Sequence, residues 1–292
     1  IISFPPESGY ISDGVEPEVG TSTMSFVYRI KYTDADDDQP ALGYPKLHIK
    51  KGGVEITGSP FSMNCQSGSY IFGVICEYTV VFQSTGTDYS YYFEAKDFYG
   101  LDAVKTLEID SPDVNSIPLL SWTGETNYTE SGVYPLSAYR ETKFDFMVKY
   151  TDADDQPPAS GYPKLHIIKD GMEISGGPFV MTLLSAPSYS SGAVYSYSSY
   201  FLPGDYEYYF EAKDSDGFLA AGLPSSTTSY FNVLNRPPTI DWTGETGYEN
   251  DGVDPDTGDE TTNYFFRIKY TDDEDDPPAT GYPLLHIEKA GV

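Results

Sequence analysis

The sequence predicts an all-β protein, and two observations carry this prediction. Residue types that favour strands are abundant, with 27 Tyr and 16 Phe, while 22 Pro and 27 Gly divide the chain into short segments. Apolar and polar residues alternate with a period of two, for example across residues 23–33, and a helical period is scarcely present. The hydrophobic content of 39% is sufficient for packed cores, so a disordered chain is not expected.

A long internal repeat organises the chain. The segment YTDADDDQPALGYPKLHI at residues 32–49 returns as YTDADDQPPASGYPKLHI at 150–167 and as YTDDEDDPPATGYPLLHI at 270–287. A period of about 120 residues corresponds to one ordinary domain rather than to a solenoid repeat. We therefore predict three units, and the third contains only the first strands. They are residues 1–117, 118–237 and 238–292.

The ends of the chain indicate a segment of a longer protein. The third copy stops less than halfway through its unit, and the first begins inside an apolar run without an initiator Met, a signal peptide or a transmembrane run. We expect a longer, processed parent chain. The alternative is a partner that completes the third unit.

Alternation places the individual strands. In TMSFVYRIKYT the residues Met24, Phe26, Tyr28, Ile30 and Tyr32 fall on one face, and polar and basic side chains fall on the other, as in a half-buried antiparallel strand. The same pattern predicts seven strands in the first unit, near residues 1–4, 23–33, 45–50, 53–62, 72–83, 88–96 and 102–110. Seven short strands in one domain are typical of an antiparallel immunoglobulin-like β-sandwich.

One segment makes this interpretation more specific. FLPGDYEYYFEAKDSDG at residues 201–217 resembles the sixth strand of fibronectin type III-like and related immunoglobulin-like domains, where a turn leads to a tyrosine-corner residue and then to alternating core residues. The matching positions here are Leu202, Pro203 and Gly204 in the turn, Tyr206 at the corner, Tyr208, Phe210 and Ala212 inward, and Asp214 and Gly217 in the loop. The spacing before the tyrosine is one residue shorter than usual. The resemblance implies tandem seven-stranded sandwiches, as in bacterial extracellular stalk, adhesin and surface-fibre proteins.

The charge narrows the class of partner. The net charge is −28, from 45 acidic and 17 basic residues, which disfavours binding to nucleic acid or to an anionic membrane surface. Strong acidity is typical of secreted proteins that stay soluble by self-repulsion or that bind cations.

The acidic residues concentrate in loops that the sandwich topology brings together. In such a fold the loop after the second strand and the loop after the sixth emerge at one end, which faces the preceding domain in a tandem array. The first of these loops carries Asp34, Asp36, Asp37 and Asp38 in copy one, Asp152, Asp154 and Asp155 in copy two, and Asp272, Asp273, Glu274, Asp275 and Asp276 in copy three. The second carries Asp97 in copy one, and Asp214 and Asp216 in copy two.

Two interpretations of these loops stay open. Crowded carboxylates repel one another unless a cation is present, and calcium prefers six to eight hard oxygen ligands, so the joints are candidate calcium sites. The alternative is a solvated turn that protects strand edges from pairing with other chains. A catalytic pair is disfavoured because the cluster recurs in every unit with no other chemistry near it.

The three histidines occupy one repeat position, in the predicted third strand. Such a repeated position is neither a triad nor a zinc site, since both need different residue types at one place. A surface strand residue is the simplest interpretation. The neighbouring sixth strand also offers tyrosines, so an exposed aromatic face for packing subunits or stacking on sugars is a further hypothesis. Its members are His48 with Tyr92 and His166 with Tyr209.

Cys65 and Cys76 occur only in the first copy, on successive strands, and the matching residues Leu183 and Val194 are apolar. We predict a disulfide between them with both side chains facing the core, which implies an oxidising, extracellular location. Two buried free thiols are the alternative. Asn127 begins a lone glycosylation tripeptide, Asn-Tyr-Thr.

These observations favour a non-enzymatic structural protein of the cell exterior. Whole-domain repeats suit reach and assembly, so we expect a stalk, or a filament formed by self-association with neighbouring repeats. The alternative is an adhesin or a glycan-binding accessory module of a larger secreted protein. The full-length sequence would distinguish these, because further copies favour the fibre and a hydrolase domain favours the accessory module.

Overall fold

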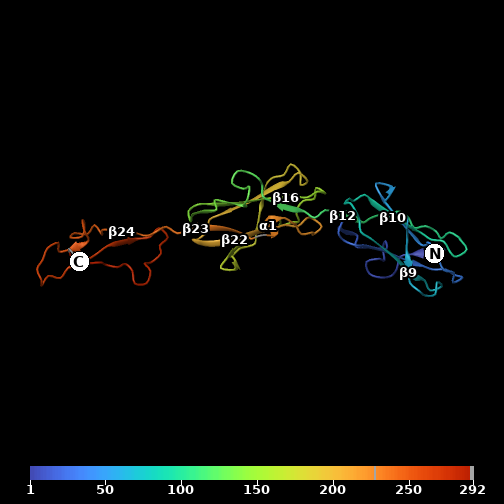
Figure 1. Cartoon of the computed structure of the whole chain (residues 1–292), viewed down its shortest axis with the longest axis horizontal. Helices are drawn as coiled ribbons and strands as arrows, with labels where there is room; N and C mark the ends of the chain where they lie inside the picture. Colours follow the sequence, from blue (N-terminus) through green and yellow to red (C-terminus); the bar gives the residue numbers. More distant parts are fainter. Residues whose placement is uncertain (227, 290–292) are drawn as a thin grey trace.

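The repeats follow one another along the long axis of the molecule (Figure 1). The computed structural model describes residues 1–226 and 228–289. Residues 290–292, at the end of the predicted third unit, lie outside the described part.

The first repeat contains two facing sheets of short strands. Its strands are β1 (Ile2–Ser3), β2 (Val15–Glu16), β3 (Val19–Thr21), β4 (Phe26–Tyr32), β5 (Lys46–Lys51), β6 (Val54–Glu55), β7 (Phe61–Ser62), β8 (Asn64–Cys65), β9 (Val74–Val80), β10 (Tyr89–Glu94), β11 (Ile109–Asp110) and β12 (Asp113–Asn115). One sheet has the order β1-β4-β9-β8, with β2 also paired to β4. The other has the order β11-β10-β5-β6, with β7 also paired to β5, while β12 pairs in parallel with β3.

The second repeat has the same arrangement. Its strands are β13 (Leu119–Ser121), β14 (Val133–Tyr134), β15 (Ser137–Tyr139), β16 (Phe144–Thr151), β17 (Lys164–Lys169), β18 (Met172–Glu173), β19 (Phe179–Val180), β20 (Thr182–Ser185), β21 (Ala193–Ser199), β22 (Gly204–Glu211) and β23 (Ser229–Leu234), with a short helix α1 (Leu223–Ser226). The sheet orders are β13-β16-β21-β20 and β15-β23-β22-β17-β18. This strand order, apart from short edge additions, is that of an immunoglobulin-like sandwich, so the chain has the predicted all-β fold.

The alternating pattern builds one core in each repeat. Along β4 the residues Phe26, Tyr28, Ile30 and Tyr32 are buried and the residues between them are half-buried. Two separate hydrophobic clusters result, one drawn only from residues of the first repeat and one only from the second. Each sandwich therefore has its own source of stability.

Both sandwiches contain the tyrosine-corner hydrogen bond. The Tyr206 hydroxyl donates to the backbone oxygen of Leu202 at 2.8 Å, and the Tyr89 hydroxyl donates to that of Ser84 at 2.8 Å. The shorter spacing before Tyr206 is accommodated because the hydroxyl reaches a carbonyl four residues upstream. This hydrogen bond fixes the segment that precedes the sixth strand in both repeats.

Two predicted strands differ from the structure. The segment 53–62 is not one strand, because a turn separates β6 from β7 and both pair with β5. Within 102–110 only β11 is a strand. The unpredicted strand β12 lies beyond it and continues into the linker to the second repeat.

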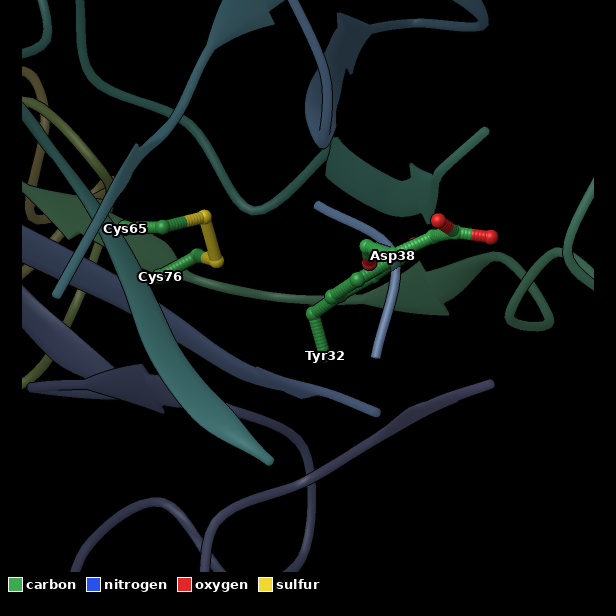
Figure 2. Close-up of a disulfide and its surroundings, with 4 residues drawn as sticks. All are labelled: Tyr32, Asp38, Cys65 and Cys76. Atoms are coloured by element: carbon green, nitrogen blue, oxygen red, sulfur yellow. Dashed lines mark hydrogen bonds between the residues drawn. A yellow bond between two sulfur atoms is a disulfide. The ribbon is translucent and has the colours of Figure 1, made fainter. Parts of the chain in front are cut away.

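Cys65 and Cys76 form the predicted disulfide between β8 and β9, shown in Figure 2. Cys76 is fully buried and Cys65 is partly buried against the same core. The expectation that Val194 is the counterpart of Cys76 in the second repeat was wrong. Cys76 lies opposite Ile30, and the equivalent place opposite Val148 holds Tyr195, not Val194.

Leu183, the expected counterpart of Cys65 in the second repeat, is more exposed than expected. Leu183 lies opposite Tyr195, as Cys65 lies opposite Cys76, but its side chain is 46% exposed rather than facing the core. The second repeat therefore replaces the covalent pair by a non-covalent cross-strand pair at the sheet edge.

Reduction of the disulfide is expected to lower the free energy of unfolding of the first repeat by about 3 kcal/mol, because the open loop adds conformational freedom to the unfolded chain. Differential scanning calorimetry with and without reductant measures this change. The second repeat contains no cysteine and serves as the internal control. A reductant effect on both transitions would contradict the prediction.

The third repeat is described only in part. Strand β24 (Thr239–Asp241) pairs with β27 (Lys269–Thr271), and β25 (Val253–Asp254) pairs with β26 (Phe265–Phe266). Phe266 is 44% exposed, whereas the equivalent Phe146 of the second repeat is fully buried. Within the described ranges, no helix has the length and apolar character needed to cross a membrane.

Candidate functional site

The acidic loop after the second strand has the same construction in all three repeats. Its first aspartate accepts hydrogen bonds from the backbone N–H groups two and four residues later. In the second repeat Asp152 Oδ1 accepts from Asp154 at 2.9 Å and from Gln156 at 3.1 Å. Asp34 and Asp272 make the same pair of contacts in their own loops. The loop shape is therefore encoded locally by the Asp-x-Asp/Glu pattern.

The loop after the sixth strand meets this acidic loop. A β-bridge joins Pro158 to Asp214, and the Ala159 N–H donates to the Lys213 carbonyl at 2.8 Å. The first repeat has the corresponding bridge between Pro40 and Asp97. The two groups of predicted site residues thus lie at one end of each complete sandwich.

One position of the predicted cluster turns away from it. Asp37 and Asp155 have left-handed backbone angles, with φ of 64° and 62°, which aspartate tolerates better than most residues. Asp37 Oδ1 accepts hydrogen bonds from Tyr70 and Ser69, and Asp155 Oδ1 accepts one from the Ser190 N–H at 2.7 Å.

These contacts lower the pKa of both carboxyls. The Oδ1 atoms of Asp37 and Asp155 bind the loop between the fourth and fifth predicted strands, and the membership of both residues in a metal site stays a prediction. In the first repeat the carboxylates that do converge are Asp34, Asp36 and Asp38, whose oxygens lie within 4.8 Å of one another. Figure 2 shows Tyr32 and Asp38, where the Tyr32 hydroxyl donates to the Asp38 backbone oxygen at 3.4 Å.

Two carboxylates of the second repeat are buried. Asp152 is 1% exposed and Asp214 is 0% exposed. Asp214 Oδ1 accepts hydrogen bonds from the N–H groups of Asp216 at 3.0 Å and Phe218 at 2.9 Å, whereas its buried Oδ2 has no partner within the described ranges. Burial raises the pKa of both carboxyls, and the charges of Asp154 and Asp214 further raise the pKa of Asp152.

The linker from the first repeat binds directly to these loops. Asn115, at the end of β12, donates from Nδ2 to Asp216 Oδ2 at 2.5 Å, and the Ser116 N–H donates to Asp154 Oδ2. Gln156 Nε2 also donates to Asp216 Oδ2 at 2.8 Å. At the first joint the linker therefore binds one carboxylate from each acidic loop of the second repeat, Asp154 and Asp216.

The second joint uses the same linker position with a different acceptor, and it adds a basic residue. Asn235, which follows β23 as Asn115 ends β12, donates from Nδ2 to Asp276 Oδ2 at 3.2 Å. Arg236 forms ion pairs with Glu141 of the second repeat and with Asp273 of the third, and its guanidinium lies 4.9 Å from the ring centre of Tyr139. A protein cation is thus present at this joint.

Sequence reasoning missed the linker residues. Asn115, Ser116, Asn235 and Arg236 were not predicted to belong to the site. The recurrence of asparagine just before each linker proline, in VNSIP and LNRPP, was the available signal.

The predicted exposed aromatic face is not present in the first repeat. His48 lies opposite Tyr92 as predicted, but its ring stacks on Tyr92 at 4.3 Å and the residue is only 9% exposed. Its two ring nitrogens lie 2.9 Å from Glu55 and 3.3 Å from Glu94.

The second repeat repeats this arrangement. His166 stacks on Tyr209 at 4.3 Å, between Glu173 and Glu211, and 12% of its side chain is exposed. The hypothesis of an exposed stacking surface fails because each imidazole is covered by groups of its own domain.

The predicted glycosylation residue lies at the surface. Asn127 is exposed, in a turn with φ of 75°. Its modification stays a prediction.

Comparison with known proteins gives structural similarity only. No family model matches the chain, and no curated protein matches it. The fibronectin(III)-like modules of Clostridium thermocellum CbhA are 13% identical, with 80% of this chain and 93% of that chain covered and a TM-score of 0.27. The Ig1–Ig3 ectodomain of mouse nectin-like molecule 4 is 9% identical, with coverage of 75% and 62% and a TM-score of 0.27.

A chimeric titin Z1Z2 structure is 14% identical, with coverage of 81% and 97% and a TM-score of 0.25. No function is transferred from similarities of this level. The fold assignment rests on the strand order and the tyrosine corners of the chain itself.

Proposed function

We propose that this chain is part of a rod that spaces or builds structures at the cell exterior, as a stalk or as a filament subunit. The observation that carries the proposal is the way the linkers are bound. Residues 113–115 are paired with the first repeat through β3, while Asn115 and the next residue bond to the second repeat. A linker held on both sides resists bending, whereas an unbound linker lets domains reorient.

The second joint is held in a comparable way. Strand β23 is paired within the second repeat, and Arg236 contacts acidic residues of both repeats. Successive sandwiches thus keep a set direction, which suits reach and mechanical spacing.

A location outside the cell agrees with two chemical properties. The disulfide in the first repeat needs an oxidising compartment to persist. The net charge of −28 keeps neighbouring molecules apart in solution. The alternative role as a glycan-binding module has less support, because the histidine–tyrosine pairs are covered within their domains.

Small-angle X-ray scattering tests the proposal directly. We expect the pair-distance distribution of the intact protein to be that of an extended rod in buffer with chelator. A short Gly/Ser insertion after Ser116 is the matched control, and it is expected to shorten the mean end-to-end distance. If the intact protein and the insertion variant both scatter as the same flexible ensemble, the linker is not bound and the proposal is contradicted. Electron microscopy then separates the two forms of the proposal, because a stalk gives isolated rods and a fibre subunit gives ordered filaments.

A further inference from the structure

We infer that copies of this chain associate side by side, with an exposed apolar edge of the second repeat seated in an apolar groove in the first repeat of another copy. The inference rests on the proposed function in its filament form and deepens it, since it names the two surfaces through which subunits join. The edge consists of Leu183 and Leu184 in β20. The groove lies between the β6–β7 segment and the end of β9.

The edge of the second repeat is apolar and uncovered. β20 ends the sheet order β13-β16-β21-β20, and all four of its residues are exposed, with Leu183 at 46% and Leu184 at 56%. Leu184 is the extra residue of a bulge, because Leu183 lies opposite Tyr195 and Ser185 lies opposite the preceding residue, Val194. A bulge hinders backbone pairing with another chain, so the two leucine side chains are what this edge offers for contact.

The groove of the first repeat is a matching recess of about 750 Å³. Val54, Ile56 and Phe61 line one wall, and the end of β9 with Val81 forms the other. β8 pairs with β9 no further than Glu77, so no strand covers this wall among the described residues. Cavities of this size hold a drug-sized molecule, which leaves room for two leucine side chains.

The charged side chains that line the groove have partners within the first repeat. Lys51 forms an ion pair with Asp88, and a carboxylate oxygen of Glu55 lies 2.9 Å from Nδ1 of His48. An apolar side chain can therefore enter without a charged partner of its own, whereas a charged one would be left unpaired.

The distribution of charge favours a second copy as the occupant. The chain has a net charge of −28, yet residues 174–204, which include β20, contain no charged side chain and no histidine. Residues 56–87 contain only Glu77, which pairs with Arg29 at 3.1 Å. Two copies that meet at these surfaces bring no unpaired carboxylates together, while like-charge repulsion opposes contact through the acidic loops. A basic partner would be attracted to those loops instead.

The placement of the two surfaces determines the kind of assembly. Because the edge and the groove lie in different repeats, each copy offers one of each, and the contact is heterologous. Such a contact continues from copy to copy and builds a filament when no ring closes. Successive copies are then staggered by one repeat.

Sedimentation velocity of the intact protein at about 1–100 μM tests the contact, and we expect the wild type to associate as its concentration rises. Leu184→Glu and Val54→Glu are each expected to weaken association at least about tenfold, because each places an unpaired charge in an apolar contact. Both side chains are exposed, so the melting temperatures should stay unchanged. Leu107→Glu is the matched control, with the same charge change at a residue of the first repeat that is 86% exposed and outside both surfaces, and it is expected to associate as the wild type does.

A mixture of the two variants makes the test specific to this pairing. Leu184→Glu keeps its groove and Val54→Glu keeps its edge, so together they are expected to form a one-to-one complex that grows no further. A monomeric wild type, a mixture that stays monomeric, or an equal loss of association in Leu107→Glu would overturn the inference. Rod-like scattering from a monomeric wild type would preserve the proposed function as a stalk. A flexible chain that still associates in this way would overturn the rod and leave the contact intact.

Discussion

Asp214→Asn is expected to raise the free energy of unfolding of the second repeat at neutral pH, because a buried charge costs more than the neutral amide that replaces it. The asparagine keeps an oxygen for the two N–H groups that Asp214 Oδ1 binds. It removes the buried negative charge beside Asp152. Equilibrium unfolding in urea measures the difference.

The pH dependence in chelator follows from the raised pKa of Asp214. Because the folded-state pKa lies above the ordinary value of 3.8, the carboxyl is protonated in both states below that value, and wild type and variant should then be equally stable. As the pH rises through the folded-state pKa, the wild type loses stability relative to Asp214→Asn. Urea unfolding at about pH 4 and pH 7 checks this direction.

Phe231→Ala is expected to destabilise the second repeat by about 3–5 kcal/mol, which corresponds to a large part of the stability of one domain. Phe231 is 3% exposed and its ring packs against a group of five aromatic rings. These belong to Phe144, Phe146, Phe201, Tyr206 and Tyr208, with centroids 4.9 to 6.1 Å away. Removal of the ring leaves a cavity that a rigid sandwich cannot close.

The effect should be confined to one repeat, because the two hydrophobic clusters share no residue. Calorimetry tests this, since the melting temperature of the second repeat should fall while that of the first repeat stays unchanged. Tyr230→Ala is the matched control on the same strand, where the side chain is 65% exposed, and a change within about 0.5 kcal/mol is expected. Loss of both transitions in Phe231→Ala would show that the repeats fold as one cooperative unit.

The repeat and the alternation made much of the fold predictable. Apolar residues at every second position place Phe26, Tyr28 and Ile30 on the buried face of a strand, and the structure buries all three. The pairing of the third and sixth strands also followed, with His48 opposite Tyr92. Short strands such as β2 and β12 were not predicted, because two or three residues carry no periodic signal.

The candidate site was predictable in location but not in membership. Sandwich topology alone brings Asp152 and Asp214 to one end. It does not indicate that Asp155 turns away towards Ser190, because that depends on a left-handed residue and a contact 35 positions along the chain. It also does not indicate which carboxylates are buried away from solvent.

The sequence by itself determined the repeat, the strand faces, the cysteine pairing and the gathering of acidic loops, because each depends on local spacing or on the topology of a common fold. Only the tertiary structure decided which charges are buried and which residues join one repeat to the next. Asn115 meets Asp216 across 101 positions of sequence. Burial of a polar group depends on such distant contacts, and at the first joint the Oδ2 atom of Asp214 is buried without a hydrogen-bond partner among the described residues.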